Sequence, residues 1–409
     1  MCYNDGVTVN FEVKVVLILL LMVMCINYFW GIKMNIRELV ACFDLSGEVT
    51  EIKESNTGNI NRTYIVSTID NGILRKYTLQ RVNVSVFKAP YLLMNNIVSV
   101  TDYCKKYLSE NGEDAERGTL SVIRTTDGDM IYKTSTGEYY RMYNYVTDTR
   151  TYDKSENAEM FYNVGIAFGH FVRMLDNYPI DNLKETIPNF HNSKVRFNSF
   201  VEDVQRDVCG RVKEVLPEIE FITDRRDELS TIVDMIESGD IPVRVTHNDT
   251  KINNVLIDDV TGKAVCVIDL DTVMPGSALY DFGDAIRSGA SKTVEDDTDL
   301  ANVGINMEFF RSFTEAYLSQ TGDILTKSEL QYLAFSCRLL ALELAMRFLN
   351  DYINGDVYFK CNYDKHNLDR ARNQIQLVRD MEVHYEEMVK IVDECVVKVK
   401  IRKLDKDHS

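Results

Sequence analysis

The sequence Val-Thr-His-Asn-Asp-Thr-Lys-Ile-Asn-Asn-Val-Leu-Ile spans residues 245–257, and Val-Ile-Asp-Leu-Asp follows at residues 267–271. In these stretches Asp249 lies between two apolar runs, Asn254 follows five residues later, and Asp269 ends the next apolar run. A spacing of five residues does not fit one helical face, so we expect a loop to bring Asp249 and Asn254 together. Turn-forming residues separate the two apolar runs, which predicts a β-hairpin with an acidic residue near each end.

These polar residues fit the chemistry of phosphoryl transfer. That reaction needs one carboxylate to orient or accept a hydroxyl proton, and oxygen ligands to hold Mg²⁺ on the phosphates of ATP. We interpret Asp249 as the catalytic base, Asn254 and Asp269 as Mg²⁺ ligands, and Asp271 as a further candidate ligand or substrate contact. A role in capping turns would explain each acid alone, but it explains the joint pattern less well.

Neighbouring residues are expected to support this loop. His247 precedes the catalytic Asp and is expected to brace the loop, while Asp281 is expected to accept hydrogen bonds from its backbone. Lys251 either offsets charge on the transferred phosphoryl group or is a solvated surface residue.

The motif resembles the aminoglycoside phosphotransferase and choline kinase superfamily, which is related to the protein kinases. Longer stretches resemble the bacterial N-acetylhexosamine 1-kinases, namely residues 58–64, 77–83, 245–251, 268–276, 280–284, 346–352 and 355–359. The resemblance covers nearly the whole chain from about Met34. It implies a two-lobed α+β fold of the protein-kinase-like type. A small antiparallel-sheet lobe, residues 34–146, would bind the nucleotide, and a larger, mainly helical lobe, residues 147–409, would hold the catalytic and sugar-binding residues.

The resemblance also implies an activity, the ATP-dependent phosphorylation of N-acetylglucosamine or N-acetylgalactosamine at the anomeric hydroxyl. It places Asn59, Asp249, Arg347 and Tyr358 near the sugar. Asn59 stands where the family commonly carries His, so the substrate preference of this chain is open. The alternatives are a kinase of another small alcohol (an aminoglycoside, choline or homoserine) and a non-catalytic pseudokinase. The intact catalytic and metal-binding motif argues against the pseudokinase.

The nucleotide site is less well defined by the sequence. Gly58 and Asn59 lie in a loop of small polar residues whose backbone N–H groups could approach phosphate oxygens. Protein kinases place a Lys on the third strand, but this chain has Gln80 and Arg81 there, and strand alternation sends the two to opposite faces. Tyr145 falls in the expected hinge, where backbone groups would pair with adenine.

The periodicity of the chain predicts the elements around these motifs. Strands are expected at 48–53, 64–68, 74–80 and 138–146, with a hairpin turn at Asn71-Gly72. Helices are expected at 36–43 and 90–109, and helical periodicity continues at 157–176, about 190–238, 305–320, 327–353 and 366–398. Pro188 and Pro217 interrupt the long middle region. The helix at 90–109 is expected to pack on the small sheet.

Composition limits the alternatives. A chain of 409 residues exceeds one ordinary hydrophobic core, so two lobes are expected. The net charge of −17 argues against non-specific nucleic-acid binding. The nine Cys residues contain no C-x-x-C pair and form no Cys/His cluster, which favours reduced thiols over a zinc site. The oligomeric state is left open.

The first 33 residues need a separate interpretation. Residues 15–32 contain no charge and have the length of a marginal membrane span. This extension is either a membrane anchor or the result of a mis-assigned start, with Met34 as the true first residue. The second reading is favoured because the resemblance begins at Met34 and an ATP-consuming enzyme needs the cytoplasmic ATP pool. We therefore expect a cytoplasmic protein, with membrane anchoring as the alternative.

Overall fold

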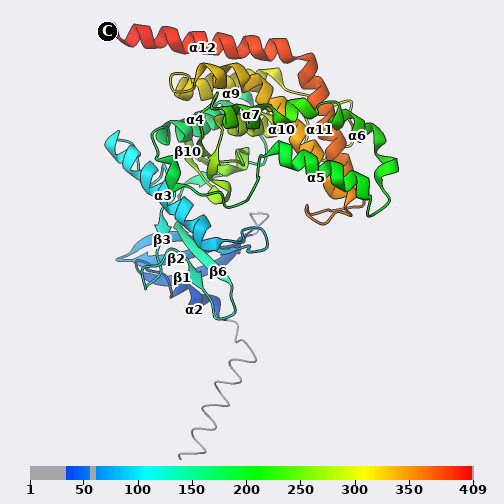
Figure 1. The fold of residues 1–409 in the computed structure, drawn as a ribbon. Helices are drawn as coiled ribbons and strands as arrows, with labels where there is room; N and C mark the ends of the chain where they lie inside the picture. The colour runs from blue at the N-terminus through cyan, green and yellow to red at the C-terminus, as the bar shows by residue number, and fades with distance from the viewer. Residues whose placement is uncertain (1–33, 56–60, 408–409) are drawn as a thin grey trace, which may run out of the picture. The chain divides into compact units, whose positions relative to one another are not determined.

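The computed structural model describes residues 34–55 and 61–407, which form two compact units (Figure 1). The first unit contains the described residues up to Val86 and the segment Val122–Tyr145, and the second contains Phe87–Ser121 and the chain from Val146 onward. The extension 1–33 and the loop residues Gly58 and Asn59 lie outside the described residues.

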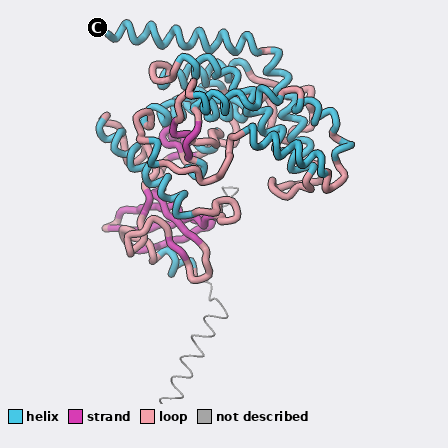
Figure 2. The backbone as a smooth tube through the Cα atoms, viewed as in Figure 1, coloured by secondary structure: helices cyan, strands magenta, loops and turns pink. Residues whose placement is uncertain are grey.

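The first unit is an antiparallel sheet with a short helix, as the sequence predicted (Figure 2). Its strands are β1 (Glu48–Ser55), β2 (Arg62–Asp70), β3 (Ile73–Val82), β4 (Val122–Ile123), β5 (Tyr132–Lys133) and β6 (Tyr139–Asn144), and the helix is α2 (Ile36–Val40). The strand order is β1-β2-β3-β6-β4, with β5 paired to β6. Asn71 and Gly72 both have positive φ (50° and 80°), which lets a two-residue turn join β2 to β3. The core lies where Leu79 and Met142 pack against Val40 and Phe43.

The second unit is mainly helical and holds three short strand pairings. The helices are α3 (Pro90–Glu110), α4 (Ala158–Met174), α5 (Ser193–Arg206), α6 (Leu216–Thr223), α7 (Arg226–Ser238), α8 (Ala278–Gly289), α9 (Met307–Thr321), α10 (Lys327–Ile353), α11 (His366–Val383) and α12 (Tyr385–Asp407). The strands are β7 (Thr149–Arg150), β8 (Arg244–Thr246), β9 (Val255–Asp258), β10 (Ala264–Val267) and β11 (Met274–Gly276). β10, β9 and β7 form one small sheet, and β11 pairs with β8. No helix in the part of the chain that the structure describes is both long and apolar enough to cross a membrane.

The structure gives the bounds of the helices within the predicted helical regions. The helical region expected at about 190–238 contains three helices, because Asp207 takes a left-handed conformation (φ 40°) at the end of α5 and Pro217 lies in the first turn of a new helix, α6. The helix expected at 366–398 ends at Val383, and α12 follows His384. The helix expected at 90–109 is present as α3 and belongs to the second unit, where Asn96 donates to the carbonyl oxygens of Lys184 and Val273. Its packing on the small sheet stays a prediction.

Helix α8 is held tightly in the second unit. All its residues except Ser288 are buried, and it packs on α10 at Gly283. A Cβ at Gly283 would come within 2.5 Å of the Ser336 carbonyl oxygen, so only glycine allows this approach. The close packing fixes Asp281 and Asp284, which point from α8 to the loop described next.

Candidate active site

The predicted hairpin brings Asn254 and Asp269 to one end of the β9–β10 pair. Val255 pairs with Val267, and one step further the Ile268 N–H donates to the Asn254 carbonyl oxygen at 2.9 Å. Asn254 ends the short 3-10 helix η3 (Ile252–Asn254), and Asp269 follows Ile268 in a left-handed conformation (φ 59°). The hairpin thus places an amide and a carboxylate side by side at the backbone level.

Asp249 is joined to this end of the hairpin by its side chain. The Asn254 amide nitrogen donates to the Asp249 carbonyl oxygen (2.8 Å) and to its Oδ2 (3.2 Å). The Lys251 ammonium lies 2.9 Å from the Asp249 Oδ1. Burial opposes ionisation of Asp249, but the Lys251 ammonium and the hydrogen bond from Asn254 outweigh it and hold the pKa of Asp249 below its usual value. Asp249 is therefore a carboxylate at neutral pH.

His247 braces the loop from behind, as expected. Its Nε2 lies 2.9 Å from the Ile268 carbonyl oxygen, and its Nδ1 accepts the Asp249 backbone N–H at 3.3 Å. An acceptor at Nδ1 and a carbonyl at Nε2 together require the neutral tautomer with the proton on Nε2. The ring is fully buried and lies in T-shaped contact with the rings of Phe168 and Phe171. It therefore ties the catalytic loop to the end of β10.

Asp281 accepts hydrogen bonds from the loop backbone, also as expected. Its Oδ2 accepts the His247 N–H (2.9 Å) and its Oδ1 accepts the Asn248 N–H (2.8 Å). Asn248 has φ 65°, a conformation that turns the chain at this point. Burial raises the pKa of Asp281 to about 6, although the hydrogen bonds from the backbone N–H groups of His247 and Asn248 lower it.

A second buried acid supports the loop, and the sequence analysis gave it no role. Asp284 accepts the Thr250 N–H at 3.0 Å and the Arg287 guanidinium at 2.7 Å. Arg287 is itself buried and also binds Glu295 (2.9 Å). No helix was predicted at this position, but the spacing of three residues between Asp284 and Arg287 was the available signal, because such a pair lies on one face of a helix.

The arrangement suits a hard cation. The Asn254 amide nitrogen is committed to Asp249, so its oxygen is the end of the amide able to bind a metal ion. Asp269 is exposed, whereas Asp271 is buried in the 3-10 helix η4 (Leu270–Thr272). In residues 34–55 and 61–407, no group of three His, Cys, Asp or Glu side chains could hold a metal by itself. Mg²⁺ does not require one, since it commonly binds one or two carboxylates together with phosphates and water. The metal role of Asp271 stays a prediction.

The nucleotide-binding candidates of the first unit occupy different environments. Gln80 accepts two hydrogen bonds from Arg141, a buried residue of β6 that the sequence analysis did not single out. Arg81 points to the other face and pairs with Glu138 at 3.0 Å. The Tyr145 N–H donates to the Lys76 carbonyl oxygen, so its backbone is held at the end of the sheet. Their contacts with a nucleotide stay predictions, as do those of Gly58 and Asn59.

The predicted sugar contacts lie in a group of aromatic and basic residues of the second unit. The Arg347 guanidinium lies 5.7 Å from the ring centre of Phe190 and 5.6 Å from that of Phe359. Tyr358 has an exposed side chain, and its N–H donates to Asp351 at 2.8 Å. Arg347 is thus stacked between rings and is not a plain surface charge.

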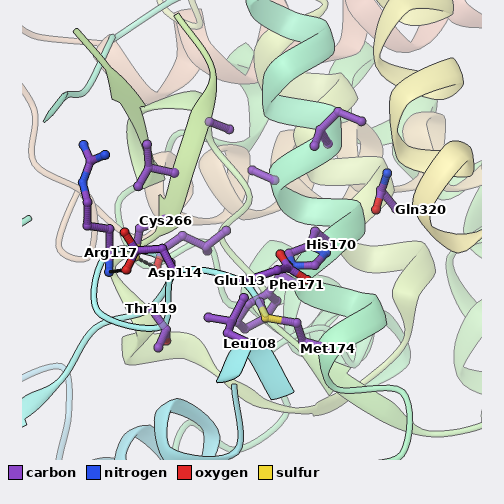
Figure 3. A pocket seen from close by; sticks show the side chains of 16 residues that line it. Leu108, Glu113, Asp114, Arg117, Thr119, His170, Phe171, Met174, Cys266 and Gln320 are labelled. Atoms are coloured by element: carbon purple, nitrogen blue, oxygen red, sulfur yellow. Dashed lines mark hydrogen bonds and ion pairs between the residues drawn. The ribbon is translucent and has the colours of Figure 1, made fainter. Parts of the chain in front are cut away.

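A cavity of about 500 Å³ in the second unit lies apart from these residues (Figure 3). It shares β10 with the hairpin, but Asp249, Asn254 and Asp269 are not among the residues that line it. Its charged groups already have partners, because Arg117 donates to Asp258 (2.9 Å) and His170 lies 3.2 Å from Glu113. Burial lowers the pKa of His170, although Glu113 opposes this. We do not assign the cavity to the reaction.

Comparison with known proteins agrees with this geometry. Residues 126–317 match the model of the phosphotransferase enzyme family known as APH. The matched segment contains the whole loop, the hairpin and α8, so the phosphotransferase class predicted from the sequence is confirmed.

Solved structures of the same class share the fold. The microcompartment-associated aminopropanol kinase superposes with a TM-score of 0.56 at 15% identity, over 86% of this chain and 97% of that one. An aminoglycoside phosphotransferase from Alicyclobacillus acidocaldarius gives 0.54 at 13% identity, over 87% and 95%. Spectinomycin phosphotransferase, solved with ADP and spectinomycin, gives 0.51 at 12% identity, over 82% and 94%. The predicted phosphotransferase-type α+β fold is therefore confirmed.

Proposed function

We propose that this protein transfers the γ-phosphoryl group of ATP, with Mg²⁺, to the anomeric hydroxyl of an N-acetylhexosamine and so forms the sugar 1-phosphate. The observation that carries the proposal is the Asp249 carboxylate, held by Asn254 at the end of the hairpin that also bears Asp269. The need for ATP makes the cytoplasm the proposed compartment.

The loop geometry suggests how Asp249 would act. Its lowered pKa keeps it ionised, so it would accept a hydrogen bond from the acceptor hydroxyl and aim the oxygen at phosphorus. Lys251, whose pKa is raised chiefly by Asp249, stays cationic and would offset charge on the transferred group. Mg²⁺ would be held by Asn254 and Asp269 and would neutralise phosphate oxygens when bound.

The residues around Arg347 favour a neutral acceptor over a cationic one. Burial and the nearby Arg347 charge lower the pKa of Arg196 to about 10, although Glu343 opposes this. The two oxygens of Glu343 are engaged by His191 (2.9 Å) and Ser193 (2.7 Å). A site for an amine would need a carboxylate directed at the ligand, and this group instead presents two guanidiniums.

A contact between two rings connects the residues around Arg347 to the catalytic loop. His191 stacks on Tyr280 with ring centres 4.8 Å apart, and Tyr280 immediately precedes Asp281, which holds the loop. Guanidinium and phenol donors suit the hydroxyl and acetamido oxygens of a sugar, since a polar site selects ligands that satisfy its hydrogen bonds. We therefore propose Arg347 and Tyr358 as sugar contacts.

Phosphorus NMR tests the proposal directly. The protein is incubated with ATP, Mg²⁺ and each of N-acetylglucosamine, N-acetylgalactosamine, glucose, galactose, choline and kanamycin. We expect a new anomeric phosphate signal with the acetylated sugars, absent in Asp249→Asn. The matched control is Asp259→Asn, an acid at the opposite end of the same hairpin that pairs with Arg150 at 2.5 Å.

The other outcomes are equally informative. Phosphate on kanamycin or choline alone would reject the sugar and retain the phosphotransferase. Nucleotide binding without transfer to any acceptor would favour the pseudokinase.

A further inference from the structure

The described part of the first unit contains one buried basic side chain, Arg141 of β6. Its exposed fraction is 1%, whereas Arg62, Arg75 and Arg81 are exposed and pair with acids on the surface. A buried charge is costly, so its position calls for a physical explanation. One of its partners lies on the neighbouring strand.

Arg141 fixes the orientation of Gln80. The two residues are directly opposite in the β3–β6 pairing, and the Arg141 Nε and Nη2 donate to the Gln80 Oε1 at 3.1 and 2.9 Å. A guanidinium has only donors, so the oxygen of the amide must face Arg141 and the NH₂ group must face away. The amide cannot flip without losing both bonds.

The NH₂ group of Gln80 therefore points along the sheet toward β2. It donates to the Thr63 Oγ1 at a long 3.3 Å, and Thr63 is the residue opposite Gln80 in the β2–β3 pairing. An amide nitrogen has two N–H donors, so this one can bind a second acceptor. Its donor strength is increased because the cation at its oxygen polarises the amide.

We propose that Gln80 and Arg141 together replace the strand lysine, with Gln80 donating to a phosphate oxygen of the nucleotide and Arg141 acting through it. The inference rests on the proposed function, since it assumes ATP as the phosphoryl donor. Gln80 is then the phosphate-binding residue of β3, and Arg141 is a positioning residue that supplies positive charge behind it. Arg81, on the opposite face of the strand, has no part in this arrangement.

The decisive variant is Gln80→Glu, which keeps the shape of the side chain. A carboxylate would pair with Arg141, so the sheet should remain folded, but it has no donor for phosphate and cancels the positive charge. We expect the Kd of ATP and ADP, measured by calorimetry on the full chain, to rise about 10- to 100-fold, as for the loss of a charge-assisted hydrogen bond. The Kd of adenosine should not change, because adenosine has no phosphate.

Arg141 variants test the positioning role. Arg141→Met should weaken ATP binding, and Arg141→Lys, which keeps the positive charge, should retain more of it than Arg141→Met. In turnover assays the KM for ATP should rise more than the KM for the acceptor. The matched control is Arg75→Gln, which alters an exposed arginine of β3 that pairs with Asp70, and this variant should bind ATP normally.

Each contrary result overturns the inference. Unchanged ATP affinity in Gln80→Glu would exclude Gln80 as a phosphate ligand. If Gln80→Glu weakened adenosine binding as much as ATP binding, the pair of Gln80 and Arg141 would have only a structural role. Weakened ATP binding in Arg81→Gln alone would assign the role to Arg81. If the wild-type protein bound neither ATP nor ADP, the proposed function itself would fail, which is distinguishable from these cases.

Discussion

The side-chain amide of Asn254 donates to Asp249 twice, to the carbonyl oxygen at 2.8 Å and to the carboxylate at 3.2 Å. One amide therefore fixes both the backbone and the side chain of the acid proposed as the base. Its own oxygen is turned away from Asp249, toward where a cation can bind.

Asp249→Asn should abolish most of the phosphoryl transfer without weakening the binding of ATP. The amide is the same size but cannot accept the hydroxyl proton, and its NH₂ group would face the Lys251 ammonium. We expect kcat to fall about 10²- to 10⁴-fold, the usual contribution of a positioned base. Calorimetry with ATP should give an unchanged Kd, and a strong loss of ATP binding would instead indicate that Asp249 is structural.

Asp269→Asn should raise the Mg²⁺ concentration needed for half-maximal activity. Removing the negative charge weakens a hard-cation site that has few protein ligands. We expect a shift of about tenfold or more, in the range seen when the surroundings of a metal site are altered. The measurement is a Mg²⁺ titration of activity at saturating ATP, with Asp259→Asn as the control. An unchanged Mg²⁺ requirement would remove Asp269 from the metal site.

Activity should decline as the pH falls below about 6, because Asp281 then gains a proton. Protonation weakens its acceptance of the His247 and Asn248 N–H groups, so the loop that carries Asp249 loosens. The pKa of Asp249 is below its usual value, so protonation of Asp249 cannot cause a decline in activity near pH 6. We expect kcat of Asp281→Asn to be low at every pH and to show no decline near pH 6. If the variant keeps the same decline as the wild type, Asp281 does not cause it.

The same group affects stability in the opposite direction. The pKa of Asp281 is higher in the folded protein than the value of about 3.9 expected for an unfolded chain. Its contribution to stability is therefore complete below about pH 4 and is lost as the pH rises through about 6. The free energy of unfolding, measured with denaturant between about pH 4 and 6, should fall with pH in the wild type but not in Asp281→Asn. The same pH dependence in both proteins would contradict this prediction.

Glu343→Gln should destabilise the second unit strongly. Burial favours the neutral form, but His191, Arg196 and Arg347 outweigh it and hold the pKa of Glu343 at about 2. Removing one member of a buried charged network costs about 3–5 kcal/mol. Since the pKa is lowered, the stabilisation is present above about pH 4.3 and is lost as the pH falls through about 2.

The measurement for Glu343→Gln is urea unfolding at pH 7. The matched control is Glu394→Gln, which breaks an exposed pair with Arg311 (2.8 Å) and should unfold like the wild type. Equal stability of Glu343→Gln and wild type would show that the network contributes no net stability.

The sequence by itself determined the parts of the protein that depend on short-range spacing. The hairpin between Asn254 and Asp269, the turn at Asn71-Gly72 and the proximity of Asn254 to Asp249 all involve residues close in the chain. Turn residues and alternating apolar runs fix such contacts locally, so they could be predicted.

Contacts between distant segments were decided only by the tertiary structure. Asp281 was assigned to the loop backbone from its motif, but the support of Thr250 by Asp284 and Arg287 was not foreseen. The pairing of Gln80 with Arg141, 61 residues apart, depends on which strand lies beside β3, and β6 follows only after α3 and a long connection.

The membership of α3 in the second unit was likewise decided by long-range bonds of Asn96. Periodicity shows that a helix has an apolar face but not which core receives it, because that choice depends on packing between segments far apart in the chain. Local spacing therefore determined the catalytic motif, and tertiary packing decided what holds it in place.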